Sequence, residues 1–124
     1  MSWWWGTPKA AKGVPRIYST HKDATAGANA MTLTLPNRGV ITRVELAANN
    51  VSEAFKLVES HVYSPRGGNT IRLAHGQLLP EEDARLVENM NVPVDKQSEV
   101  GCTFYGMTAA VVIWMQVSVL EEES

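Results

Sequence analysis

The sequence contains very little of what most enzymes and metalloproteins need. Cys102 is the single cysteine among 124 residues, which excludes an intrachain disulfide framework and a zinc site built from clustered cysteines. No His-x-His pair of the kind used by cupin metal sites occurs, and no nucleophile elbow, Walker loop or dinucleotide-binding glycine motif is present. We therefore expect no enzyme, no catalytic or metal-binding residue, no cofactor and no small-molecule substrate.

Long hydrophobic runs are missing as well. No apolar stretch approaches the roughly 20 residues that a membrane-spanning helix requires. The chain begins with Met-Ser-Trp-Trp-Trp-Gly-Thr-Pro-Lys, where the apolar cluster is short and the positive charge follows it, unlike a secretory signal peptide. We expect a protein that is made in the cytoplasm and does not enter a membrane.

Amphipathic helices are not indicated anywhere, whereas a hydrophobic period of two runs from Met31 to Leu120. Such alternation is typical of half-buried β-strands. The segment from Ala109 to Leu120 is apolar on both faces of its first half, which predicts a central strand. Val92-Pro93-Val94 predicts an edge strand, because proline cannot donate to a β-ladder. The expected strands cover residues 31–35, 40–48, 54–63, 70–75, 92–94, 100–105 and 109–120.

Seven or eight short strands separated by turns predict an all-β fold, namely a two-sheet antiparallel β-sandwich of jelly-roll type. A small barrel of the OB type is the alternative. Residues 80–86 are expected to form a short helical turn or a loop. Within the strands, the pattern predicts that Phe55 and Leu57 point inward, as do Ile71 and Leu73.

The first 29 residues have no hydrophobic periodicity. Pro8, Gly13 and Pro15 interrupt any regular element, and the stretch 23–29 is small and polar. The sequence therefore predicts an extended N-terminal arm and linker over residues 1–29, followed by a β-sandwich domain over residues 30–124. On this division, residues 2–20 should be dispensable for folding.

Charge is divided unevenly along the chain. Residues 1–22 contain four bases and no acid, whereas the remainder contains seven bases and thirteen acids. A basic arm on an acidic body suits an arm that reaches an acidic neighbour.

Trp3, Trp4 and Trp5 are the most distinctive feature of the arm. Three adjacent exposed indoles would form an apolar patch that promotes association, and tryptophan is a leading hot-spot residue at interfaces. We expect these side chains to be buried, either in a neighbouring subunit or against one end of their own domain. The predicted interaction residues are Trp3, Trp4, Trp5, Lys9, Lys12 and Arg16. Such an arm could also stack bases and neutralise phosphates, but the acidic body opposes a duplex, so nucleic acid is not an expected partner.

Two further groups of residues could carry chemistry. His61 and His75 flank an expected hairpin and could face each other across it, which would suit a small metal-dependent β-barrel enzyme. Cys102 lies in an alternating strand, where a buried and unreactive thiol is the ordinary occupant.

The chain resembles the small virion structural proteins of tailed bacteriophages, such as decoration, cement and minor head or tail proteins. The resemblance is one of organisation: the arm from Trp3 to Thr20, the small-residue linker at 24–30, and the closing strands at 92–94, 101–106 and 109–120. It implies a homo-oligomer, with a trimer favoured, that sits in a virion and contacts a capsid or tail protein through its termini. It implies no catalytic residue.

A different class of function remains open beside the structural one. A ligand-binding β-sandwich, such as a carbohydrate-binding module, would display aromatic side chains to solvent for stacking on sugars. The aromatic residues available in the predicted domain are Phe55, Tyr63, Phe104, Tyr105 and Trp114.

Overall fold

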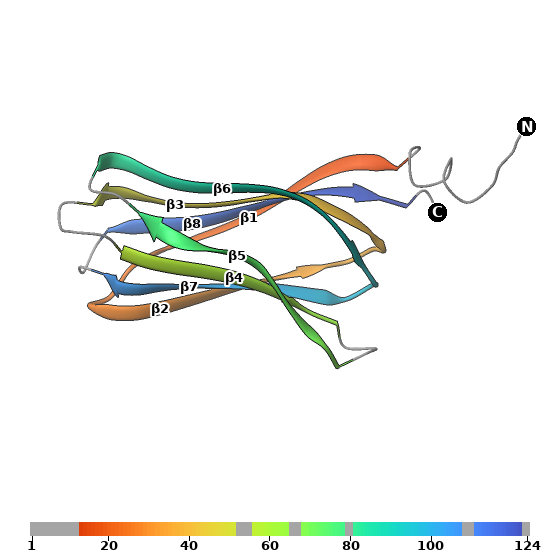
Figure 1. Cartoon of the computed structure of the whole chain (residues 1–124), viewed down its shortest axis with the longest axis horizontal. Coiled ribbons are helices and arrows are strands. Elements are labelled where there is room, and N and C mark those ends of the chain that lie inside the picture. The colour runs from red at the N-terminus through yellow and green to blue at the C-terminus, as the bar shows by residue number, and fades with distance from the viewer. Residues whose placement is uncertain (1–12, 52–55, 65–67, 79–80, 108–110, 123–124) are drawn as a thin grey trace, which may run out of the picture.

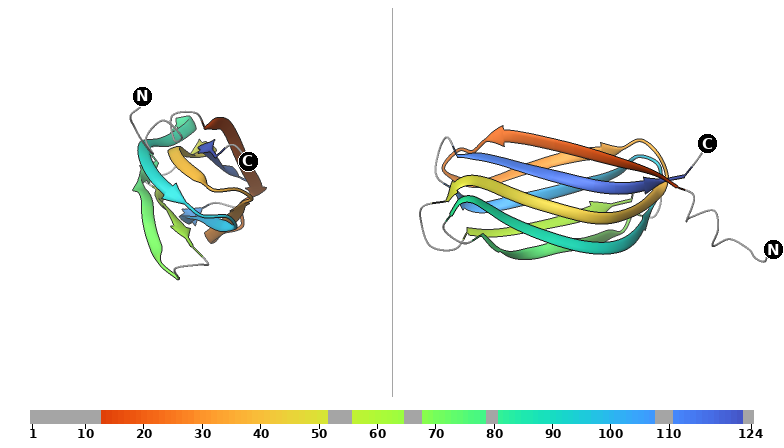
Figure 2. Two further views of the ribbon diagram at one scale, coloured as in Figure 1. Left: turned by 90° about the vertical axis from the view of Figure 1, so that its right-hand side faces the viewer. Right: turned by 90° about the horizontal axis from the view of Figure 1, so that it is seen from above.

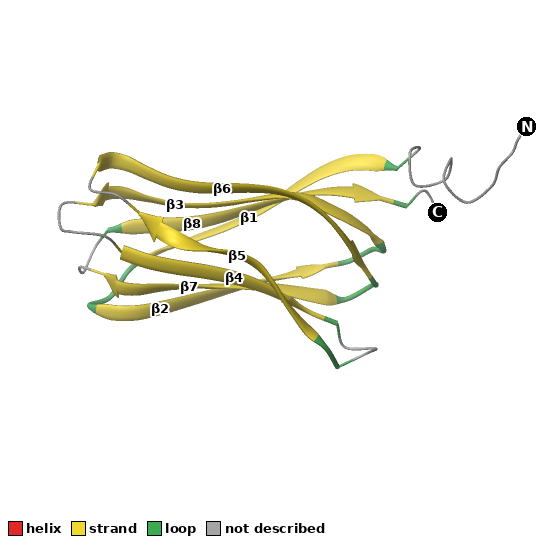
Figure 3. Cartoon of the chain, in the orientation of Figure 1, coloured by secondary structure: helices red, strands yellow, loops and turns green. Residues whose placement is uncertain are grey.

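A computed structural model describes residues 13–51, 56–64, 68–78, 81–107 and 111–122. These residues form eight β-strands and no helix, as Figure 3 shows. The all-β prediction is thereby confirmed. The strands are β1 (Val14–Asp23), β2 (Gly27–Leu35), β3 (Gly39–Val51), β4 (Lys56–Tyr63), β5 (Thr70–Leu78), β6 (Glu81–Val94), β7 (Ser98–Met107) and β8 (Val112–Glu121).

The strands make two four-stranded antiparallel sheets packed face to face (Figure 1). One sheet has the order β1-β8-β3-β6 and the other has the order β2-β7-β4-β5. Of the connections between consecutive strands, only β4–β5 joins neighbours within one sheet, and every other connection crosses between the sheets. This alternation is the winding of an eight-stranded jelly roll, and the right-hand view in Figure 2 looks down onto the β1-β8-β3-β6 sheet, with the other sheet behind it.

The core lies between the sheets, and β8 contributes its most regular part. Ile113, Met115, Val117 and Val119 are all buried, and they alternate with half-buried residues along β8. The predicted central strand is confirmed, because β8 pairs with β1 on one side and with β3 on the other. Phe104 is the largest fully buried side chain and enters the same core from β7 in the opposite sheet.

The predicted arm over residues 1–29 is wrong for its second half. Val14–Asp23 forms β1, which pairs with β8 in register from Val14 opposite Glu121 to Asp23 opposite Val112. β1 is an edge strand, so Pro15 is tolerated because one side of the strand needs no donor. Deleting residues 2–20 would remove most of β1, and the arm that could be dispensable for folding ends before Gly13.

The helical turn or loop expected over residues 80–86 is also wrong for the part that is described. Residues from Glu81 onward belong to β6, a strand of 14 residues that pairs with β3 along almost its whole length. The acidic run resembles a first helical turn, but cross-strand pairing decides the conformation of short segments more strongly than local propensity does. The prediction of an edge strand at Val92-Pro93-Val94 is confirmed, because β6 closes its sheet.

A bulge in β3 determines that Ile41, rather than Val40, faces the core. The register of β3 shifts between Ile41 and Arg43, and Ile41 is fully buried whereas Val40 is only half-buried. A bulge inserts one residue and thereby reverses the face of everything before it.

In β4 the inward phase was assigned to the wrong residues. Val58, Ser60 and Val62 face the core, and Leu57 is exposed. Ser60 hides the pattern because a polar residue occupies a core position, where its hydroxyl donates to the carbonyl oxygen of Gly101 at 2.9 Å. Phe55 lies outside the described residues.

The neighbouring strand β5 was also misassigned in part. The register shifts between β4 and β5 at Ser60/His61. Ile71 is 50% exposed and Leu73 is half-buried, whereas Ala74 and Leu78 are buried.

Replacing Phe104 tests how far stability depends on packing between the sheets. Phe104→Ala removes a fully buried ring and should lower the free energy of unfolding by about 3–5 kcal/mol, as large-to-small core substitutions do. Urea unfolding followed by circular dichroism measures the change. Gln116→Ala, on the outer face of β8, is the matched control and should change stability by less than about 1 kcal/mol. Equal effects of the two substitutions would contradict the assigned core.

Candidate functional sites

The predicted interaction residues divide into two groups. Trp3, Trp4, Trp5, Lys9 and Lys12 lie outside the described residues, so their expected role stays a prediction. Arg16 lies in β1, where its Nε atom is 3.7 Å from Glu121 Oε1. The Arg16 side chain is 59% exposed, so this ion pair adds little to stability.

A pocket lies at the end of the sandwich where β1 begins and β8 ends. Its volume is about 400 Å³, which is within the range of about 300–1,000 Å³ that is typical of ligand pockets. Its apolar wall comes from the ends of β3, β6 and β8, and its charged wall contains three acids and one arginine. The lining residues are Gly13, Arg38, Gly39, Val40, Pro93, Val94, Asp95, Leu120, Glu121 and Glu122.

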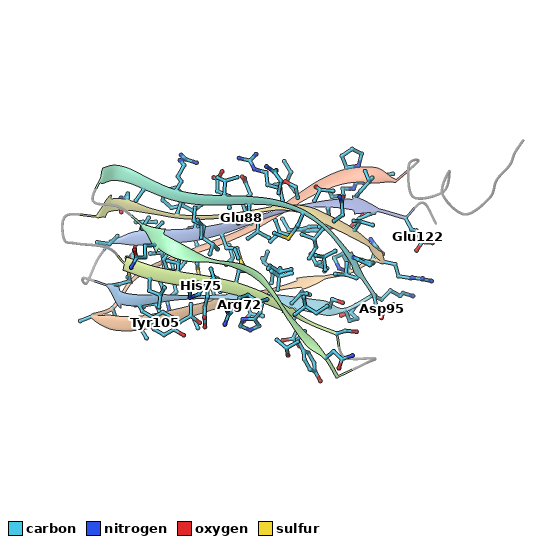
Figure 4. The ribbon with its side chains drawn as sticks, viewed as in Figure 1. Arg72, His75, Glu88, Asp95, Tyr105 and Glu122 are labelled. Carbon is cyan, nitrogen blue, oxygen red and sulfur yellow. The ribbon has the colours of Figure 1, made fainter. Side chains whose placement is uncertain are left out.

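Figure 4 shows Asp95 and Glu122 at this same end of the molecule. Arg38 Nε is 3.2 Å from Glu122 Oε2, so part of the acidic charge is compensated. Arg16 also lies beside Glu121, so the three acids of the lining are set against two arginines and leave a formal charge of −1 among these groups. Gly39 allows the close approach of strands here, since a Cβ atom at this position would lie 2.5 Å from the carbonyl oxygen of Leu120.

Glu121 is the buried acid of this pocket, and several side chains hold it in place. The Tyr18 hydroxyl donates a hydrogen bond to Glu121 Oε2, and Asn37 Nδ2 donates to Oε1 at 3.3 Å. The hydrogen bond to Glu121, together with burial and the nearby negative charge, raises the pKa of Tyr18 above its usual value. A carboxylate fixed in this way forms a rigid negative wall.

A second cluster lies on the outer face of the β2-β7-β4-β5 sheet. The register places Thr103, Glu59 and His75 in one row across β7, β4 and β5. The next row contains Gly101, His61 and Arg72. Figure 4 shows Tyr105, His75 and Arg72 together over this sheet.

Gly101 lies in the middle of this face and is buried. A Cβ atom there would lie 3.2 Å from His61 Nε2, so the imidazole leans over the glycine. A shallow pocket of about 260 Å³ opens beside it, lined by Glu59, Ser60, His61, Thr70 and Arg72.

His61 and His75 do not face each other. His61 is opposite Arg72 and His75 is opposite Glu59, so the geometry expected for a two-histidine metal site is wrong. Among the described residues, no group of three or more histidine, cysteine or acidic side chains is arranged to hold a metal ion.

Tyr105 is tied to this cluster by a direct contact. Its hydroxyl donates to Glu59 Oε1 at 2.8 Å, and the hydrogen bond to this acid raises the pKa of Tyr105 above its usual value. Tyr105 is 37% exposed and Tyr63 is 38% exposed. The side chains of both tyrosines therefore face solvent.

Sequence analysis named Tyr63 and Tyr105 among the aromatic residues of the domain but did not predict that they share this face. The alternation within β7 is a signal that could have found part of it. Phe104 is buried, and Tyr105, its neighbour in sequence, must then point outward. Tyr63 gave no such signal, because Ser60 obscures the phase of β4.

The outer face of the β1-β8-β3-β6 sheet carries a different arrangement. Glu45 is 7% exposed and lies between two arginines, 3.1 Å from Arg43 Nη2 and 2.7 Å from Arg85 Nη1. The Arg85 guanidinium also lies 5.8 Å from the ring centre of Trp114, a cation–π geometry. Each charge in the cluster has a partner, which is typical of a structural network.

No helix in the described part of the chain has the length and apolarity needed to cross a membrane. Cys102 is buried, and burial raises the pKa of its thiol to about 12. The prediction that the Cys102 thiol is buried is confirmed. Its lack of reactivity stays a prediction.

Comparisons with known proteins show only distant structural similarity. No family model and no curated protein matches the chain. Among solved structures, the Drosophila NLP core, studied for pentamer formation and histone binding, is 20% identical and has a TM-score of 0.43, with 82% of this chain and 95% of that chain covered.

Two other similar structures belong to assemblies. A structure of infectious bursal disease virus, Gx strain, is 11% identical, with a TM-score of 0.49, and the match covers 86% of this chain but only 32% of the viral chain. A subunit of Bacillus endospore appendages, described as disulfide-linked pili, is 15% identical, with a TM-score of 0.43 and coverage of 91% and 92%.

The state of Cys102 can be tested directly. Because its raised pKa keeps the thiol protonated far above neutral pH, iodoacetamide at about pH 8 should label the folded protein at least about a hundredfold more slowly than the protein in urea. Mass spectrometry measures the rate of modification. Similar rates in both conditions would show that Cys102 is accessible and reactive.

Proposed function

We propose that this chain is a non-enzymatic structural subunit of a larger assembly, a virion decoration or minor structural protein that forms a homo-oligomer. In this proposal, the Trp-rich basic arm of one subunit docks in the end pocket of its neighbour. The observation that carries the proposal is the position of the pocket, because Gly13, the residue that follows the arm, lies on its rim.

The arm is long enough to leave its own subunit. Trp5 is eight residues before Gly13, and eight extended residues span at most about 26–29 Å. An arm that starts beside one pocket can therefore reach a symmetry-related pocket nearby. Exchange of a terminal segment between identical subunits is a low-cost route to oligomers.

The chemistry of the pocket matches that of the arm. An indole needs an apolar cavity and a partner for its N–H group, and the pocket offers Val40, Pro93 and Leu120 beside the carboxylates of Asp95 and Glu121. The same acids attract the positive charges of the arm. Binding would thus combine apolar burial with electrostatic complementarity.

The edges of the sandwich favour association as well. The strands β1, β6, β2 and β5 are edge strands, and uncovered edges promote pairing with other chains. Ile17, on β1, is 66% exposed, which adds apolar surface next to an open edge. A closed ring, with a trimer favoured, would cover such a surface, and a capsid or tail protein is the proposed external partner in the virion.

Removal of the arm tests the proposal. Deleting residues 2–12 leaves β1 intact, so the variant should show the β-sheet spectrum of the parent protein but a smaller mass in solution. Circular dichroism and multi-angle light scattering measure the two properties. Loss of folding would indicate that the arm packs on its own domain, and an unchanged oligomer would contradict docking by the arm.

A matched pair of substitutions tests the pocket. Val40→Arg places a cation in the pocket and should repel the basic arm, which lowers the oligomeric mass. Val87→Arg introduces the same charge on the same sheet, at a half-exposed position of β6 that does not line the pocket, and should leave the mass unchanged. Equal effects of the two substitutions would place the interface elsewhere.

Mixing the two defective proteins separates docking on a neighbour from docking within one chain. The deletion variant keeps a pocket and the Val40→Arg variant keeps an arm. An equimolar mixture should therefore form one-to-one dimers, detectable by light scattering and native mass spectrometry. Failure of the two to combine, with both folded, would contradict exchange of the arm.

A further inference from the structure

We infer that the outer face of the β2-β7-β4-β5 sheet is a carbohydrate-binding surface, on which an oligosaccharide lies along β4. The inference is independent of the arm and its pocket, since it rests on residues in the opposite sheet. It could serve a structural subunit that attaches a particle to a glycan-coated surface.

The centre of this face supplies the hydrogen-bonding groups that a sugar requires. A sugar presents closely spaced hydroxyls that both donate and accept. Glu59 accepts, Arg72 donates in a fixed fork geometry, and the imidazole of His61 can do both. These three side chains line one pocket of about 260 Å³, which is smaller than the range of about 300–1,000 Å³ for drug-sized ligands. The pocket therefore suits one ring of a longer chain.

Glycine at position 101 makes room for the imidazole of His61, which a Cβ atom there would approach to 3.2 Å. Beside Gly101 in β2 lies Thr32, and across it in β4 lies His61. The row therefore has a glycine and a small hydroxyl side chain on one side of the imidazole. The glycine lets the imidazole lie close to the sheet, beside the pocket that His61 lines.

Apolar surfaces lie at both ends of the polar centre. Tyr105 and Leu57 are both exposed, on β7 and β4, at one end, and Tyr63 is exposed on β4 at the other. Tyr63 is six positions after Leu57, which corresponds to about 20 Å along a strand. Aromatic rings with an apolar body and a polar tip can stack on the C–H faces of sugars.

The charges on this face favour a sugar over a polyanion or an apolar partner. The described outward-facing groups include two acids, Glu59 and Glu99, and one arginine, Arg72, beside the titratable His61 and His75. A nucleic acid requires a clear excess of positive charge, which is absent from this set. The dense polar centre would in turn be poorly satisfied by an aliphatic protein surface.

The network between Tyr105 and Glu59 helps to preorganise the site. The hydrogen bond of 2.8 Å fixes one carboxylate oxygen, so Glu59 Oε2 stays available to a ligand hydroxyl. A preformed acceptor reduces the ordering cost of binding.

A glycan array probed with the full-length protein tests the inference, followed by titration calorimetry with the strongest neutral oligosaccharide. Glu59→Gln, Arg72→Ala and Tyr105→Ala should each weaken binding by at least about tenfold, because each removes a hydrogen-bonding or stacking group. Gln116→Ala, on the outer face of the other sheet, is the control and should change the affinity less than twofold. All variants are compared by circular dichroism to confirm folding.

Three results would overturn the inference. The first is that the folded wild-type protein binds no glycan on an array that contains neutral and acidic chains. The second is equal binding by the three variants and the control. Recognition restricted to polyanions, and lost in Arg72→Ala alone, would instead identify a simple anion site. None of these results bears on the oligomeric mass, so the proposed assembly role is tested separately.

Discussion

The pairing of β8 with both β1 and β3 is the constraint on which the remaining structure depends. β8 buries four apolar side chains against the opposite sheet, and it can do so only if its own two edges are hydrogen-bonded. The first described strand is therefore paired with the last one. This pairing brings Gly13 beside Leu120 and Glu121 and so creates the rim of the end pocket.

The outer faces of the two sheets differ in how far their charged side chains are paired with one another. On the β1-β8-β3-β6 sheet, Glu45 is neutralised by two arginines and Trp114 is covered in part by Arg85. On the β2-β7-β4-β5 sheet, Glu59, His61 and Arg72 line an open hollow. The first face is internally satisfied, whereas the second offers hydrogen-bonding groups to solvent. The same fold serves many unrelated functions. The proposed functions therefore rest on these differences between the two faces and not on the fold.

Much of the fold follows from the sequence because a period of two reports burial directly. The long strand at the C-terminus, the edge position of Pro93 and the two-sheet architecture were all predictable. β1 was not, because an edge strand with Ile17 pointing to solvent and Tyr18 only half-buried has too little apolar alternation. Its conformation is imposed by the ladder with β8 rather than by its own residues.

The candidate sites were harder to predict than the fold. The end pocket combines residues from four separate segments of the chain. No local sequence pattern predicts that these segments lie together. The proposed sugar-binding face was hidden by Ser60, a polar residue in the core whose hydroxyl is satisfied by Gly101. In contrast, the tryptophan cluster was visible in the sequence from the start, and the end pocket is the docking site that we propose for it.

Cross-linking between differently labelled copies tests the central claim most directly. A photoreactive amino acid replaces Trp4, and the protein is assembled from an equal mixture of ¹⁴N-labelled and ¹⁵N-labelled chains before irradiation. The proposed exchange of arms predicts cross-links between light and heavy chains that join position 4 to the segments around Val40, Pro93 or Leu120. Cross-links confined to single chains, or directed to surfaces away from this pocket, would contradict it.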